Sequence, residues 1–522
     1  MQYDYIVIGA GSAGCAVAAR LSENGRYQVL LLEAGGPDDE QNIHVPVTFP
    51  LLFKTPFDWA YETEPQKYLN GRIEYMPRGK AFGGSSSINA MIYQRGNPAN
   101  YNTWAEMGNE GWAWEDVLPY FRKAQNQERG ESEYHAVGGA INVADLRDPS
   151  PLSQALVQAA GEQGYPINDD FNGASQEGFG LYQVTQKNGM RHSAAVAYLH
   201  PALTRENLTA VPHAHVQHLT FDGPRCTGAV YHKNGAAHTA TAAHEVIVCT
   251  GAINSPQLLM LSGIGPRETL EKFGIEVVMD LPGVGQNLQD HLMAPVAYHA
   301  TQPITLTAAA SEEQFAKFQE GKGMLTSNVG EAGGFLKLNP ESAAPELQFH
   351  FAPGWFILHG AGNPEGHGFT LTSGIVGCKS VGHLTLRSAD PHDPPLIDPN
   401  YLSAEEDMTV IVEGIKIARQ ILNSAAFDAY RGEEYLPGAA VQSDEELREF
   451  VRNWAQNIYH PVGTCKMGHD PMAVVNDRLQ VHGIQGLRVA DASIMPFIIN
   501  ANTNNPCIMI GEKCADLILS GE

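Results

Sequence analysis

Apolar and glycine-rich segments alternate in the first sixty residues. Residues 5–8 are an apolar run that predicts a buried strand, and residues 15–21 have the composition of a buried helix. A second apolar run covers residues 27–32 and ends at Glu33. The pattern predicts a strand, a turn, a helix and a second strand, which is the βαβ order of a dinucleotide-binding unit.

The turn between the first predicted strand and the helix reads Gly9-Ala10-Gly11-Ser12-Ala13-Gly14. Gly9 allows a tight turn, Gly11 lets the backbone approach a pyrophosphate, and Gly14 lets the helix pack on the strand. Glu33 follows 19 residues after Gly14 and is placed to accept hydrogen bonds from a ribose diol. A glycine turn in this context predicts a dinucleotide site.

Two later segments add to this unit. Residues 79–89 are rich in glycine and serine, which fits either a backbone pressed against a flat ligand or a flexible hinge. Residues 245–252 repeat the change from buried strand to glycine turn, and we expect a helix to begin at 256–261 with Pro256 in its first turn. The cofactor domain is therefore predicted to be discontinuous in sequence.

The remaining segments have a different pattern. Amphipathic helices are predicted at 311–319 and 405–422, and residues 382–387 alternate as a strand does. The sequence thus predicts an α/β, Rossmann-like cofactor domain and an α+β substrate domain with an antiparallel sheet. We assign residues 1–145, 200–295 and 465–522 to the cofactor domain, and residues 146–199 and 296–464 to the substrate domain.

Composition narrows the possible partners. Lys and Arg number 33 against 58 Asp and Glu, so the net charge is −25, which disfavours nucleic acid as a partner. The seven cysteines form no CxxC pair, as expected in a reducing compartment. The first residues lack the basic region of a signal peptide, and no apolar run is long enough to span a membrane. We expect a cytoplasmic protein; peripheral membrane association and oligomeric state stay open.

Several motifs, in order along the chain, resemble the glucose-methanol-choline (GMC) family of FAD oxidoreductases. They are the glycine turn with Glu33-Ala34, residues 78–91, residues 251–265, residues 460–468, Asp491-Ala492-Ser493 and residues 502–506. Choline-dehydrogenase-like and alcohol or hydroxymethylfurfural oxidase-like members are the most similar. The resemblance covers the whole chain and implies FAD-dependent oxidation of a primary alcohol.

The resemblance also implies which residues hold FAD. These are Gly9, Gly11, Ser12, Ala13, Gly14, Glu33, Ala34, Gly83, Gly84, Ser86, Asn89, Ala90, Met91, Val216, Gly251, Asp491, Ala492, Asn502 and Pro506. Some members of the family tether FAD through a histidine in the first signature, but Ile88 stands at that position here. We therefore expect non-covalent FAD.

Alcohol oxidation at a flavin removes a hydroxyl proton and a hydride from the same carbon. Histidine, with an ordinary pKa of about 6.5, suits the first task, and the flavin N5 accepts the hydride. The resemblance assigns the general base to His460 and a hydrogen bond to the developing alkoxide to Asn502. The product is the aldehyde or, after a second oxidation, the acid.

Two other clusters are weaker candidates. His213, His215 and His218 have a spacing that could ligate a metal, but no cysteine or carboxylate cluster accompanies them, so we expect no metal. Trp355 and Phe356 are aromatic residues that fit either a core or the wall of a substrate pocket. As a pocket wall they would favour a neutral aliphatic or aromatic alcohol over a quaternary amine.

Three alternatives differ in function class. A photodecarboxylase-like lyase of the family lacks the histidine found at position 460, and a hydroxynitrile lyase would use that base without flavin redox chemistry. A non-catalytic flavoprotein would have lost the His460 and Asn502 pair. The sequence leaves open whether electrons pass to O₂ or to another acceptor, because oxygen reactivity depends on access and charge at the flavin.

Overall fold

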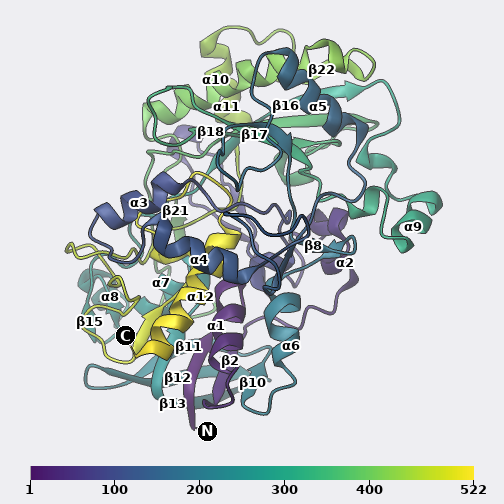
Figure 1. Ribbon diagram of the computed structural model, residues 1–522. Helices are drawn as coiled ribbons and strands as arrows, with labels where there is room; N and C mark the ends of the chain where they lie inside the picture. The colour runs from purple at the N-terminus through teal and green to yellow at the C-terminus, as the bar shows by residue number, and fades with distance from the viewer. Residues whose placement is uncertain (1, 522) are drawn as a thin grey trace.

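The computed structural model describes residues 2–521 and contains two large sheets, which lie at the bottom and the top of Figure 1. The first sheet has the order β10-β2-β1-β13-β12-β11, and β24 pairs with β13 beside this path. Its strands are β1 (Gln2–Ile8), β2 (Val29–Leu32), β10 (Leu208–Val211), β11 (His215–Asp222), β12 (Arg225–Lys233), β13 (Ala236–Val248) and β24 (Leu487–Val489). The predicted Rossmann-like unit is confirmed.

The parallel strands of the first sheet end in register. Ile8 pairs with Leu32 on one side and with Val248 on the other. The segments that begin at Gly9 and Glu33 therefore leave the sheet at the same edge, the carboxyl edge, where ligands bind in open α/β sheets.

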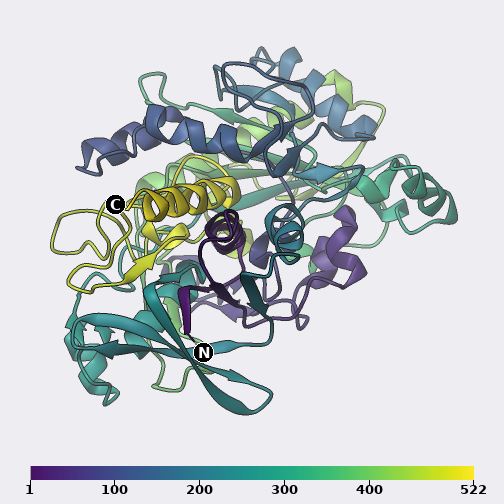
Figure 2. The same ribbon diagram turned by 60° about the horizontal axis from the view of Figure 1, so that its bottom comes forward.

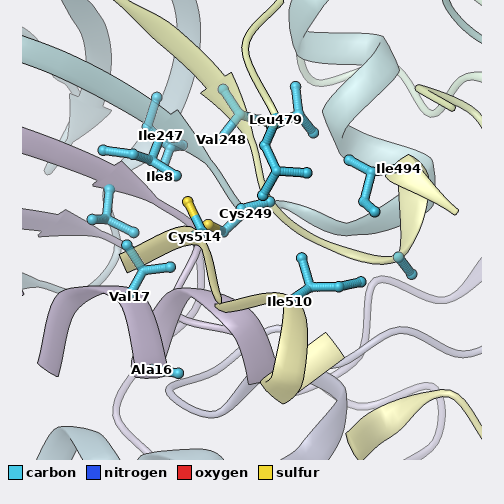
Figure 3. Close-up of a cluster of buried hydrophobic side chains, with 14 of the residues drawn as sticks. Ile8, Ala16, Val17, Ile247, Val248, Cys249, Leu479, Ile494, Ile510 and Cys514 are labelled. Atoms are coloured by element: carbon cyan, nitrogen blue, oxygen red, sulfur yellow. The ribbon is translucent and has the colours of Figure 1, made fainter. Parts of the chain in front are cut away.

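The glycine turn brings α1 (Ser12–Leu21) close to β1. Gly9 has a φ of +94°, and a Cβ atom on Gly14 would lie 1.9 Å from the Gly9 carbonyl oxygen. Both positions therefore require glycine, for the turn and for the close approach of helix to strand. Figure 3 shows the apolar core near this turn, which includes Ile8, Val17 and Cys514 of α12 (Asn504–Ser520).

The helix after β13 differs from the prediction. Instead of starting at 256, α7 covers Gly251–Leu261, with Pro256 in its interior. Pro256 has no N–H to donate to the carbonyl oxygen of Ala252 one turn earlier. The hydroxyl of Thr464 donates to that oxygen instead, at 2.6 Å, which allows the helix to include the proline.

The second sheet is antiparallel, as predicted, with the order β22-β16-β19-β18-β17-β7 and β23 paired to β16. Its strands are β7 (Gly178–Leu181), β16 (Leu292–Ala300), β17 (Ala332–Leu336), β18 (Leu347–Ala352), β19 (Gly368–Ile375), β22 (Arg431–Leu436) and β23 (Gln456–Asn457). The helices α5 (Pro151–Glu162) and α10 (Glu405–Leu422) cover one face, at the top of Figure 1.

Each sheet is assembled from segments far apart in the sequence. In Figure 2 the C-terminal helix α12, in yellow, lies beside α1, in purple, although their positions in the chain are almost 500 residues apart. The predicted domain boundaries remain a prediction; β16 starts at Leu292, four residues before the proposed boundary at 296.

The structure contains further helices besides those described above. They are α2 (Gln41–His44), α3 (Pro98–Glu106), α4 (Trp114–Ala124), α6 (His200–Ala202), α8 (Arg267–Lys272), α9 (Glu312–Gln319) and α11 (Asp444–Trp454). The remaining strands form two-stranded pairs: β3 (Tyr61–Glu62) with β4 (Tyr75–Met76), β5 (Gln125–Gln127) with β6 (Ile141–Val143), β8 (Gln186–Lys187) with β9 (Met190–Arg191), β14 (Ile264–Gly265) with β15 (Met279–Asp280) and β20 (His383–Thr385) with β21 (Leu396–Asp398). Within residues 2–521 no helix has the length and apolarity to cross a bilayer.

Candidate functional site

One cavity touches both sheets. It is lined by Glu33 and Val216 at the carboxyl edge of the first sheet, and by His460 and Phe356 beside the second. Most of the residues predicted to bind a cofactor or substrate line this cavity: Gly9, Gly11, Ser12, Ala13, Glu33, Ala34, Gly84, Asn89, Ala90, Met91, Val216, Gly251, Phe356, His460, Asp491, Ala492 and Asn502.

Five predicted site residues lie outside the lining of the cavity: Gly14, Gly83, Ser86, Pro506 and Trp355. Gly14 and Pro506 belong to the first turns of α1 and α12, while Gly83 and Ser86 support the lining turn through hydrogen bonds to Ala10 and Ala194.

Trp355 is the clearest correction. Its indole N–H donates to the Gly366 carbonyl, and its ring packs against His299 and Tyr435. Its neighbour Phe356 lines the cavity, because consecutive residues of an extended chain face opposite sides. Trp355 therefore belongs to the core of the second sheet.

The carboxylate of Glu33 is buried at the carboxyl edge of the first sheet. Its Oε2 accepts from the Ala10 N–H and its Oε1 from the Gly35 N–H, both at 2.8 Å. Burial raises the pKa of Glu33 to about 7, against the lowering effect of these two hydrogen bonds. Glu33 thus holds the glycine turn in place and keeps one lone pair on each oxygen for a ligand hydroxyl.

The lining residues at this end fit FAD. A Cβ atom on Gly251 would meet nothing within 4 Å, and one on Gly11 would meet only the Cys249 carbonyl oxygen at 3.9 Å, so both positions leave room for a ligand beside the backbone. No side chain caps α1, which leaves the N–H groups of its first turn available to phosphate oxygens. Asp491, which also lines the cavity, accepts a hydrogen bond from the Gly251 N–H at the start of α7 at 2.8 Å.

His460 lies at the opposite end of the cavity and is 8% exposed. Its backbone N–H donates to Asp290 Oδ1 at 2.7 Å, and the same oxygen accepts from the His291 N–H at 2.9 Å. The Asp290 Oδ2 atom accepts from the Tyr401 hydroxyl at 2.6 Å. One buried carboxylate therefore positions the backbone of both histidines.

A chain of hydrogen bonds defines the proton positions on His460. Gln348 Nε2 donates to Asn502 Oδ1 at 2.9 Å, so Asn502 presents its Nδ2 to His460 Nε2 at 3.2 Å. An amide nitrogen only donates, so Nε2 of His460 is the acceptor and the ring proton is on Nδ1. That Nδ1 lies 3.0 Å from Nδ1 of His291, which accepts the proton. The lone pair of His460 thus faces the cavity.

Three histidines with lowered pKa values meet at this end. Burial is the main cause in each case, and it brings the pKa of His291 to about 3 and that of His350 to about 4. The pKa of His460 lies well below 6.5 through burial, with smaller contributions from His291, His350 and the Arg78 guanidinium. All three imidazoles are therefore neutral near pH 7.

Alternation along the second sheet explains the wall beside His460. In β18, Phe349 and Phe351 point into the apolar core, whereas His350 and Ala352 line the cavity. On β19, Thr372 lines the cavity directly opposite His350. His350 is absent from the residues predicted from the sequence, although the alternation of residues 347–352 indicates that it faces away from the core. His291, Asp290 and Gln348 are absent as well, and no local pattern in the sequence marks them.

Apart from Thr370 and Thr372, most of the other lining residues at this end are apolar. The apolar residues are Phe49, Phe53, Ala90, Met293, Val329, Ala352, Phe356 and Ile458. The ring of Phe53 lies 5.7 Å from that of Tyr459, the residue before His460, and the ring of Phe49 lies 6.3 Å from that of Phe356. The charged side chain nearest to His460 in the lining is Arg78, which donates to the Tyr459 carbonyl oxygen at 2.5 Å. No carboxylate adjoins this apolar wall among the described residues that line the cavity.

Comparison with known proteins identifies relatives along nearly the whole chain. Family models of GMC oxidoreductase match residues 3–293 and residues 378–511. An alcohol dehydrogenase [acceptor] of Pseudomonas putida is 46% identical over 99% of this chain and 96% of its own length. The mitochondrial choline dehydrogenase of Homo sapiens is also 46% identical, over 99% of this chain and 90% of its own length.

A solved structure has the same architecture. An Aspergillus oryzae formate oxidase, crystallised to follow the effect of a mutation on FAD modification, superposes with a TM-score of 0.94 at 29% identity. The match covers 100% of this chain and 98% of that chain. The two sheets and the cavity between them therefore follow the arrangement of GMC flavoenzymes.

Proposed function

The chain belongs to the GMC oxidoreductase family, and on this premise we propose that it oxidises a neutral primary alcohol to an aldehyde, with FAD as cofactor and His460 as general base. The observation that carries the proposal is the 3.2 Å contact between Asn502 Nδ2 and His460 Nε2 at the apolar end of a cavity whose other end fits FAD. Relatives named for alcohol and for choline dehydrogenation support the reaction class.

Asn502 and His460 have complementary roles toward one oxygen atom. An alcohol oxygen that lies beside both atoms, in place of their direct contact, would receive a hydrogen bond from Asn502 Nδ2 and give its proton to His460 Nε2. FAD bound in the cavity would accept the hydride from the alcohol carbon. Asn502 then stabilises the negative charge that develops on the oxygen as the proton leaves.

His291 and Asp290 support the base. When His460 takes the proton, its Nδ1–H still donates to His291 Nδ1, so the hydrogen bond keeps the imidazole ring in the same orientation. The buried Asp290 carboxylate accepts the backbone N–H groups of both histidines and so keeps their main chains in place. Neither group contacts the alcohol; both act through His460.

The apolar wall favours a neutral alcohol over a quaternary amine. Aromatic and aliphatic side chains such as Phe49, Phe356 and Val329 suit a hydrocarbon, and no carboxylate among the described lining residues adjoins them. The buried guanidinium of Arg78 lines the same cavity and repels a cation. We expect aliphatic and aromatic primary alcohols to be substrates, and choline to be a poor one.

Anaerobic mixing with single substrates tests the proposal. Hexanol and benzyl alcohol should bleach the yellow absorbance of the enzyme, and choline at equal concentration should do so far more slowly. Faster bleaching by choline would overturn the substrate assignment. Bleaching by none of these alcohols would favour a lyase-type reaction, and admission of air to the bleached enzyme then shows whether O₂ or another molecule accepts the electrons.

FAD should be bound without a covalent link. Ile88, at the position where some family members carry the tethering histidine, lines the cavity with a saturated side chain that has no nucleophilic atom. Acid precipitation of the holoenzyme should release all of the FAD into the supernatant. Yellow colour in the washed pellet would contradict this assignment.

A further inference from the structure

Arg191, in the short strand β9, is a buried cation without an anionic partner. Its side chain is 2% exposed, and within residues 2–521 it forms no ion pair. Its Nε donates to the Ile43 carbonyl oxygen at 2.6 Å and its Nη1 to the Ser86 carbonyl oxygen at 3.0 Å, while Nη2 is buried with no hydrogen-bond partner. Burial alone lowers the pKa of Arg191 to about 9, so the guanidinium is charged at neutral pH.

A buried guanidinium of this kind is costly, because removing a charge from water costs several kcal/mol unless an opposite charge compensates. Burial lowers the pKa of Arg78 as well, but there the carboxylates of Asp290 and Asp58 act against that shift. Arg191 has no such neighbour in the chain. Arg191 also differs from the buried Arg95, because its Nη2 has no hydrogen-bond partner and it lies behind the cavity wall, so a negatively charged ligand in the cavity would supply compensation that the chain does not.

The position of Arg191 indicates which ligand this is. Its Nη1 donates to Asn89 Oδ1 at 2.8 Å, and that oxygen also accepts from the Met91 N–H at 3.0 Å. Asn89, Met91 and the nearby Ile88 all line the cavity at the turn predicted to lie along the flavin. Arg191 is thus directly behind the cavity wall, and the side chain of Asn89 separates it from the space that FAD would occupy.

We propose that Arg191 is a positioning and electrostatic residue that favours the reduced form of bound FAD, through its hydrogen bond to Asn89. Reduction by a hydride adds negative charge to the cofactor, and an uncompensated positive charge behind the wall stabilises that state in a medium of low dielectric constant. The inference rests on FAD as the cofactor of the proposed function, and does not depend on which alcohol is the substrate.

The test is the midpoint potential of the bound FAD, measured by equilibration with a reference dye under dithionite, without any alcohol. Arg191→Gln keeps an N–H donor near Asn89 and removes the charge, whereas Arg191→Lys keeps the charge. We expect Arg191→Gln to shift the equilibrium at least tenfold toward oxidised FAD, which is about 30 mV for a two-electron couple. Arg191→Lys should stay close to the wild-type potential.

Arg95 provides a matched control. It is fully buried and bonds to Tyr93, Tyr134 and Gln125, none of which lines the cavity. Arg95→Gln should leave the potential unchanged. A potential in Arg191→Gln equal to wild type, or one that falls equally in Arg95→Gln, would overturn the proposal and leave Arg191 with a structural role.

Asn89→Asp is a second route if Arg191→Gln does not fold. The isosteric carboxylate can accept from both Arg191 Nη1 and the Met91 N–H. Its negative charge compensates the guanidinium while Arg191 itself is unchanged. The potential should fall here as well, and an unchanged potential contradicts the proposal. If wild-type enzyme is reduced by dithionite but by no alcohol, the proposed function fails while this test remains valid.

Discussion

The Nδ1 atoms of His291 and His460 lie 3.0 Å apart, and the two rings are almost perpendicular at 89°. Both imidazoles are neutral, so one Nδ1 donates to the other, and because Asn502 Nδ2 donates to Nε2 of His460, the donor is His460 Nδ1. His291 and Asn502 together therefore hold His460 in the tautomer whose Nε2 lone pair is proposed to accept the proton of the alcohol.

Loss of His291 should slow the reaction without removing the base. In His291→Phe nothing accepts the Nδ1–H of His460, so the inactive tautomer becomes accessible and anaerobic FAD reduction should slow by roughly 10- to 100-fold, the value of one or two hydrogen bonds to a charged group. His291→Asn places an amide oxygen near the lost acceptor and should recover part of the rate. Equal rates in His291→Phe and wild type would remove His291 from the mechanism.

His460 and Asn502 should differ in their effects. His460→Ala removes the base and should slow anaerobic FAD reduction by about 10²–10⁴ with FAD still bound. Asn502→Ala removes one hydrogen bond to the developing alkoxide and should cost about 10–10³. Stopped-flow absorbance with benzyl alcohol measures both rates, and a wild-type rate in His460→Ala would assign proton abstraction to another residue.

The pH dependence of FAD reduction should have its acid limb below the ordinary range of histidine. The folded pKa of His460 is lowered from 6.5, so neutral imidazole, the active form, persists as the pH falls through 6.5. The rate should be constant above about pH 7 and should decline only in more acidic buffer. A rate that keeps rising between pH 7 and 9 would exclude His460 as the titrating base.

Glu33 should contribute to FAD affinity. Glu33→Ala should weaken FAD binding by roughly 1–3 kcal/mol, because the ribose loses a buried hydrogen-bond acceptor and the Ala10 and Gly35 N–H groups lose theirs. Glu33→Gln keeps one oxygen acceptor and should lie between Ala and wild type. Titration of the apoprotein with FAD measures the series, and identical affinities would separate Glu33 from the cofactor.

Thr464 should matter for stability rather than for catalysis. Thr464→Val has nearly the same shape but cannot donate to the Ala252 carbonyl oxygen, which Pro256 leaves without a helical partner. The buried acceptor should cost about 1–3 kcal/mol of unfolding free energy in urea titrations of the holoenzyme. Thr464→Ser retains the hydroxyl and should lose less; equal stability of Val and Ser variants would argue against this role.

The sequence by itself determined the local features of the protein. The order of apolar runs and glycines predicted β1, α1 and β2, and the motif around His460 predicted the base, because these features depend on residues close together in the chain. The α10 helix at Glu405–Leu422 was predicted at its observed bounds for the same reason, since its apolar positions recur at helical spacing.

Tertiary structure decided what depends on distant residues. Neither the start of α7 nor the place of Trp355 could be predicted, because the first depends on Thr464 and the second on which face of the chain the sheet buries. His291 and His460 are separated by 169 residues, and only the pairing of β16 with β23 in the second sheet brings their nitrogens together. The sequence predicted His460 as the proton acceptor, while the fold sets the tautomer of this histidine and lowers its pKa through burial.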